Sequence, residues 1–153
     1  MDAVYISRNT VFAATAGAKT VLKLIQPTSF NFKIHQIMVS MDGVTSTAVP
    51  ALVDWGTSTE AGAGTQNGTA VTTQVKGRAQ AHGLTVGQNF TVEGTTYTIS
   101  NNVLVPQYMG LFVIQFPLGF EPESPGDAAS SWFLRINVTA NVNVYASVKW
   151  CRA

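Results

Sequence analysis

The last third of the chain alternates apolar and other residues with a period of two, and this pattern restricts the fold more than any other feature. Three segments carry it, 111–118, 132–138 and 142–150. Every second residue from Trp132 to Val138, and from Val142 to Trp150, is apolar, whereas segment 111–118 is apolar at both parities. Strand side chains alternate between the two faces of a sheet. The pattern therefore predicts three strands of a sheet with one buried and one wet face.

The rest of the chain shows many short strand-like segments separated by Thr, Gly, Asn and Pro turns. We expect strands near 4–7, 10–14, 30–41, 48–55 and 70–79, a hairpin at 89–100 and a short strand at 103–105; segment 19–26 fits a strand or two helical turns. Pro50 cannot donate a hydrogen bond to a neighbouring strand, so the strand at 48–55 is expected to lie at an edge or to pair poorly at that point. This spacing predicts an all-β antiparallel sandwich, with a barrel and a jelly-roll order as open alternatives.

The segment 30–41 changes the phase of its alternation at His35-Gln36. Before this point Phe30, Phe32 and Ile34 share one parity, and after it Ile37 and Met41 share the other. A slip of one residue turns buried side chains outward unless a bulge absorbs it. We therefore expect a β-bulge near His35-Gln36, or else two separate strands.

The length of 153 residues fits one domain. We divide it into an N-terminal arm with short strands, 1–18, and a β-sandwich, 19–153, with a loop and hairpin elaboration at 56–109. Long surface loops are expected at 56–69 and 120–130. Charged residues make up 11% of the chain, against about 25% in a typical soluble protein. This scarcity favours a subunit packed into an assembly over a solitary soluble enzyme.

Residues suited to catalysis are few. The chain has two histidines, His35 and His82, but no Ser in a G-x-S-x-G turn for which either could act as general base. The single cysteine, Cys151, excludes an intrachain disulfide and a zinc site built on thiolates. Glu121, Glu123 and Asp127 are interpreted as solvated loop charges. We predict no catalytic residue, cofactor or metal.

The charge and hydropathy of the chain also argue against two classes of partner. The net charge is +1 without a basic run, which argues against nucleic acid and an anionic membrane. Apolar runs fall short of the ~20 residues of a membrane helix, and the N-terminus does not look like a signal peptide.

The aromatic residues have two interpretations. Trp55, Trp132 and Trp150, with several Phe residues, could form a platform for stacking sugars, but parity assigns Trp132 and Trp150 to the core. Phe133 and Tyr145 take the opposite parity, so we expect them to be exposed and to contact another subunit. Phe120, in the Pro-rich loop, is a similar candidate.

Two blocks, Ser40–Trp55 and Gly110–Trp150, resemble small all-β structural proteins of tailed bacteriophages, of the head-decoration or cement kind. The strongest parts are DGVTSTAVP, QFPLGFEPE and LRINVTANVNVYASV. The blocks cover a little over a third of the chain, and their motifs are structural rather than catalytic. Segment 56–109 lies outside them.

The resemblance implies a non-enzymatic virion protein, made in the host cytoplasm and placed on the outer surface of the phage head. Its partners would be the major capsid protein and itself, as a homotrimer. In such a protein we expect the N-terminal arm, with Val4, Tyr5, Ile6 and Phe12, and the loops 56–69 and 119–131 to make contacts. The alternative is a tail or adhesin module that binds a host-surface glycan, which a solvent-facing Trp55 would favour. A β-sandwich hydrolase is a third candidate, but the sequence shows no base–nucleophile set.

Overall fold

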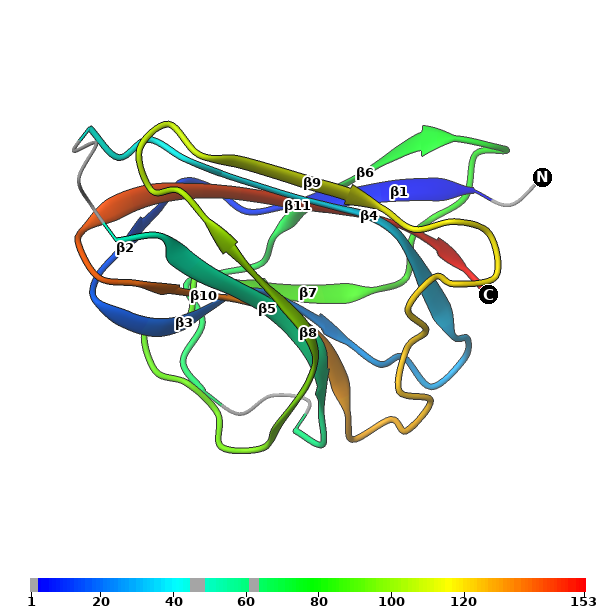
Figure 1. The fold of residues 1–153 in the computed structure, drawn as a ribbon. Coiled ribbons are helices and arrows are strands. Elements are labelled where there is room, and N and C mark those ends of the chain that lie inside the picture. Colours follow the sequence, from blue (N-terminus) through cyan, green and yellow to red (C-terminus); the bar gives the residue numbers. More distant parts are fainter. Residues whose placement is uncertain (1–2, 45–48, 61–63) are drawn as a thin grey trace.

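The protein is a sandwich of two antiparallel sheets (Figure 1), as seen in a computed structural model that describes residues 3–44, 49–60 and 64–153. The six-stranded sheet holds β1 (Val4–Arg8), β2 (Phe12–Ala14), β4 (Phe32–Met41), β6 (Val71–Lys76), β9 (Leu111–Gln115) and β11 (Val142–Arg152). The five-stranded sheet holds β3 (Gly17–Ile25), β5 (Ala51–Ser58), β7 (Thr85–Gln88), β8 (Tyr97–Val105) and β10 (Ser131–Val138). The described residues contain no helix, which confirms the predicted all-β sandwich. Ala48, at the start of one predicted strand, residues 61–63 of the predicted loop and residues 1–2 of the predicted arm lie outside the described residues.

The strand order is that of a jelly roll. Strands far apart in the sequence pair in a nested way: β1 with β11, β3 with β10, β4 with β9 and β5 with β8. These eight strands form two four-stranded sheets wound together. The segment between β5 and β8 adds one edge strand to each sheet, β6 beside β1 and β7 beside β3. The jelly-roll order, which the sequence left open, is therefore the observed one.

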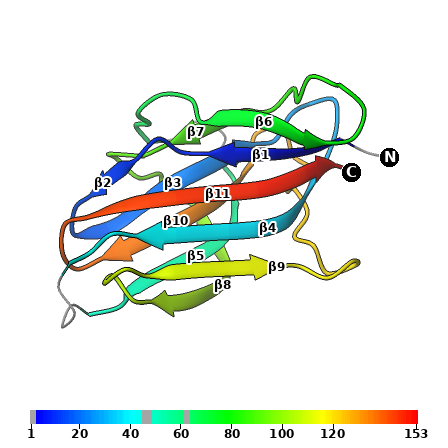
Figure 2. The ribbon, with the colours of Figure 1, turned by 90° about the horizontal axis from the view of Figure 1, so that it is seen from above.

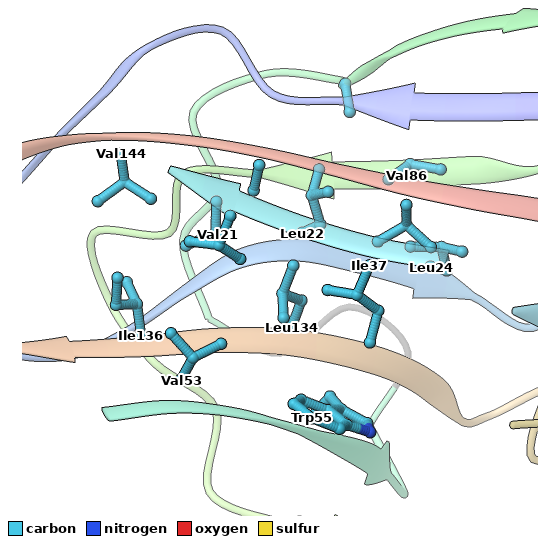
Figure 3. Close-up of a cluster of buried hydrophobic side chains, with 14 of the residues drawn as sticks. Val21, Leu22, Leu24, Ile37, Val53, Trp55, Val86, Leu134, Ile136 and Val144 are labelled. Carbon is cyan, nitrogen blue, oxygen red and sulfur yellow. The ribbon is translucent and has the colours of Figure 1, made fainter. Parts of the chain in front are cut away.

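The alternating residues of the terminal strands form the core between the sheets (Figure 3), as predicted. Each alternate residue from Trp132 to Val138 and from Val142 to Trp150 is buried. Trp150 stacks on Tyr5 with ring centroids 4.7 Å apart, and its indole N–H donates to Ser7 Oγ at 2.9 Å. These contacts hold the first strand against the last.

The predicted β-bulge is confirmed at His35. In the pairing of β4 with β11, Gln36 lies opposite Lys149 and Ile34 lies opposite Trp150, so His35 is the extra residue. Because the bulge absorbs the phase change, Ile34 and Ile37 are both fully buried. The strand continues through the bulge rather than breaking into two.

The predicted N-terminal arm is wrong, because the start of the chain is built into the sandwich. Strand β1 lies between β6 and β11, and β3 begins at Gly17. Of the two expectations for Pro50, the edge position is wrong, because β5 lies between β10 and β8. Weak pairing at Pro50 is confirmed, because the strand and its pairing begin at Ala51.

The predicted hairpin at 89–100 is not formed either. Strand β8 runs through Asn101-Asn102 and pairs along its whole length with β5. Segment 56–109 is therefore not an appended hairpin, since it supplies β6, β7 and β8, each at the edge of a sheet.

Candidate docking face

The outer face of the five-stranded sheet is covered by the protein's own chain around Phe133 and Asp54, whereas Leu104 and Asn137, which face outward at its other end, are exposed. The described residues of the connections from β5 to β6 and from β7 to β8 lie on the side of this sheet away from the core (Figure 1). Glu93, in the connection from β7 to β8, accepts hydrogen bonds from Thr20 Oγ1 at 2.6 Å and from the Tyr97 hydroxyl at 2.8 Å. The Tyr97 ring packs edge-on against Phe133, with centroids 4.7 Å apart. These contacts fix the cover to the sheet.

Charged side chains beneath this cover are engaged with one another and with aromatic rings. Arg135 donates two hydrogen bonds to the Asp54 carboxylate, at 3.0 and 2.9 Å, and its guanidinium lies 4.7 Å from the Tyr97 ring. Lys23 is fully buried, with its Nζ 5.5 Å from the Phe90 ring, and burial lowers the pKa of its amine. Because this cluster is enclosed, its role is to fasten the cover.

The outer face of the six-stranded sheet is uncovered in the part of the chain that the structure describes. Figure 2 looks onto this face, and no described segment crosses β6, β1, β11, β4 or β9. We call it the open face. It comprises the outward-facing side chains of Val4, Ile6, Arg8, His35, Gln36, Met38, Ser40, Val71, Thr73, Lys76, Leu111, Val113, Gln115, Tyr145, Ser147 and Lys149.

One half of the open face is apolar. Leu111 and Tyr145 both lie beside Ser40, and Val113 lies beside Met38, so their side chains are neighbours across β9, β4 and β11. Their exposed fractions are 64% for Leu111, 46% for Tyr145, 46% for Val113 and 39% for Met38. A contiguous exposed apolar patch of this kind marks an interaction site.

The other half carries positive charge. Arg8 and Lys149 project from β1 and β11, with Lys76 at the end of β6. Within the described residues, these three cations form no salt bridge. Two carboxylates from the connection between β9 and β10 are engaged elsewhere, since Glu123 pairs with Lys33 at 3.3 Å and Glu121 lies 3.9 Å from His35. The open face is thus complementary to a surface that is apolar and acidic.

The structure brings some of the predicted contact residues to the surface. Tyr145 lies on the open face, and Phe120 is 79% exposed in the connection from β9 to β10. Val4 and Ile6 face outward from β1 and are partly exposed.

The expected exposure of Tyr5 and Phe133 is wrong. Tyr5 is 1% exposed, because it faces the core and stacks on Trp150. Phe133 does face outward, as its parity indicates, but the cover over the five-stranded sheet buries it completely. Phe12 is half-buried and packs against the core.

Sequence reasoning missed Met38, Leu111 and Val113 as contact candidates. In segment 111–118 both parities are apolar, so alternation alone could not show which face stays open.

The structure does not provide the exposed tryptophan that glycan binding would favour. Trp55 is 3% exposed and packs against Phe112 and Phe116, with centroids 6.0 and 6.4 Å away. Trp132 and Trp150 are buried in the core, as their parity predicted.

Neither histidine is placed with a nucleophile. His82 Nδ1 accepts a hydrogen bond from the Leu84 N–H at 3.1 Å. His35 lines a groove to which the described residues bring no Ser, Thr or Cys. No three His, Cys, Asp or Glu side chains within 3–44, 49–60 and 64–153 are grouped to hold a metal ion. The same residues include no helix long and apolar enough to cross a membrane.

Fold and surface together define a jelly-roll protein with one partly covered and one open sheet face. No family model, curated protein or solved structure matches the chain.

Proposed function

We propose that this chain is a non-enzymatic structural protein of a tailed-phage virion that binds the major capsid protein lattice on the outside of the head. The open face is the docking surface. The observation that carries the proposal is the asymmetry of the sandwich, since the outer face of one sheet is partly covered by its own chain and the other sheet keeps an apolar, cationic face exposed.

The position of the resemblance in the fold supports this role. The block Gly110–Trp150 contains β9, β10 and most of β11, and it contributes Leu111, Val113 and Tyr145 to the open face. Jelly rolls recur in viral capsid proteins, although they also occur in lectins, so the fold alone is an analogy.

The low charge content fits a subunit that works inside an assembly. A decoration protein gains affinity from many weak contacts repeated over a lattice, and an apolar face with a few cations suits such contacts. Self-association, expected as a homotrimer, would use other surfaces.

The copy number of the chain in purified virions tests this function. A head-decorating protein occupies sites over the whole shell, so we expect hundreds of copies per particle, measured by quantitative mass spectrometry against the major capsid protein. A few copies per particle would indicate a tail component, and no copies would remove the virion role.

A further inference from the structure

A groove of about 580 Å³ lies on the open face. Its lining residues lie at the end of the sheet where the chain's C terminus is found, an end that Figure 2 shows. Five neighbouring strands contribute to its lining: β6 with Lys76, β1 with Val4, β11 with Lys149, β4 with His35 and β9 with Gln115. The three residues that follow β9 complete it. The volume falls in the range of ligand-binding sites in proteins.

The polar side of this groove is cationic. Lys76 and Lys149 have no carboxylate partner within 3–44, 49–60 and 64–153. The β-bulge directs His35 to the same side, which is a common use of a bulge near a functional site. Glu121, the carboxylate nearest to His35, also accepts a hydrogen bond from the Gly119 N–H at 2.6 Å. The groove therefore presents lysines ready to bind an anion.

The opposite wall of the groove is apolar. Phe116, Pro117 and Leu118 line it, and the Leu118 side chain is 88% exposed. These three side chains give the groove an apolar surface open to solvent. Simple phosphate sites are built from charged and polar groups, so this wall favours a ligand with carboxylates and an apolar side chain.

The breadth of the sheet sets the length of the ligand. From β6 to β9 there are four steps between neighbouring strands, and each step is about 4.8 Å, so the groove spans roughly 19 Å. An extended chain rises about 3.3 Å per residue, so roughly six residues fill it.

We propose that this groove binds an extended acidic segment of a partner protein, with carboxylates on Lys76 and Lys149 and an apolar side chain against Leu118. The inference rests on the proposed function for the identity of the partner, which would be the capsid protein. The chemistry of the segment follows from the groove alone.

Calorimetric titration of the purified full-length chain tests the inference. The probe is an acetylated, amidated hexapeptide of alternating Glu and Leu, and the control peptide has Gln in place of each Glu. We expect saturable binding of the Glu peptide and at least tenfold weaker binding of the Gln peptide. We expect the affinity for the Glu peptide to fall severalfold at 0.5 M NaCl, because salt screens exposed charges.

Two charge reversals locate the binding site. Lys149→Glu should weaken binding of the Glu peptide at least tenfold. Arg78→Glu changes the net charge equally but lies outside the groove lining, and it should change the affinity less than twofold. Both side chains reach solvent, so neither change should disturb folding.

Four results would overturn the proposal: no binding of the Glu peptide, equal binding of the two peptides, equal loss in the two variants, or tighter binding of a thymidine hexanucleotide. The last result would identify a phosphate site. If the chain decorates capsids but does not bind the Glu peptide, the groove proposal fails and the proposed function stands. Peptide binding by a chain absent from virions would remove the proposed function alone.

Discussion

Removing Asp54 should destabilise the fold because it leaves a buried cation without its partner. Arg135 and Asp54 lie opposite each other on β10 and β5, with side chains only 16% and 5% exposed. Breaking a buried ion pair costs about 3–5 kcal/mol. Because the guanidinium keeps some exposure and stacks on Tyr97, we expect Asp54→Ala to cost about 3 kcal/mol, the lower end of that range. For a chain of this size that lowers Tm by roughly 6–12 °C.

A double variant separates loss of the pair from loss of its charges. Asp54→Leu with Arg135→Met replaces both ions with apolar side chains, which is often neutral, so we expect stability within about 1 kcal/mol of the wild type. Urea unfolding followed by far-UV circular dichroism measures each free energy by linear extrapolation. A cost below about 0.5 kcal/mol for Asp54→Ala is what a surface substitution gives, and it would show that the pair does not fasten the cover. A double variant as unstable as the single one would show the same.

Three further predictions concern other parts of the fold. Deleting residues 3–9 removes β1 from between β6 and β11, so the chain should fail to fold cooperatively, and a native-like melting curve would contradict this placement. Phe133→Ala should cost about 3–5 kcal/mol in urea unfolding, whereas Phe120→Ala should cost less than about 0.5 kcal/mol; equal costs would place both rings in the same environment. Backbone hydrogen bonds, chiefly from the N–H of Glu121 itself, hold the pKa of the Glu121 carboxyl below its ordinary value of 4.5. The stability that this carboxylate contributes is therefore present above pH 4.5 and is lost as pH falls toward the lowered pKa. Glu121→Gln should therefore flatten the fall of Tm below pH 4.5, and an unchanged slope would exclude this group.

The terminal strands could be predicted from the sequence because their alternation is a local property. Every second residue from Val142 to Trp150 lies on the same face of the strand, whichever strand it pairs with. The pattern therefore identified both the strand and its buried side. The bulge at His35 was predictable for the same reason, since a phase change is visible without knowing the partner strand.

The pairing partners of the short strands could not be predicted, because pairing is a long-range property. Val4–Arg8 has the same local pattern in a free arm as between β6 and β11. The outward parity of Phe133 was right, but its burial depends on Tyr97 and the connections from another part of the chain. The open face was missed for the same reason, because a face is open only when no distant segment covers it.

Binding of the purified chain to capsids that lack it, measured by co-sedimentation over a concentration series, distinguishes the open face from the rest of the surface. Val113→Glu places a carboxylate in the apolar half, and Ile99→Glu is the matched control on edge strand β8, since the two wild-type side chains are 46% and 45% exposed. Burying a carboxylate without a partner costs more than the roughly 1.4 kcal/mol that corresponds to tenfold in affinity. We therefore expect Val113→Glu to bind at least tenfold more weakly and Ile99→Glu to bind like the wild type. Wild-type affinity for Val113→Glu, with both variants folded, would show that the open face does not meet the capsid.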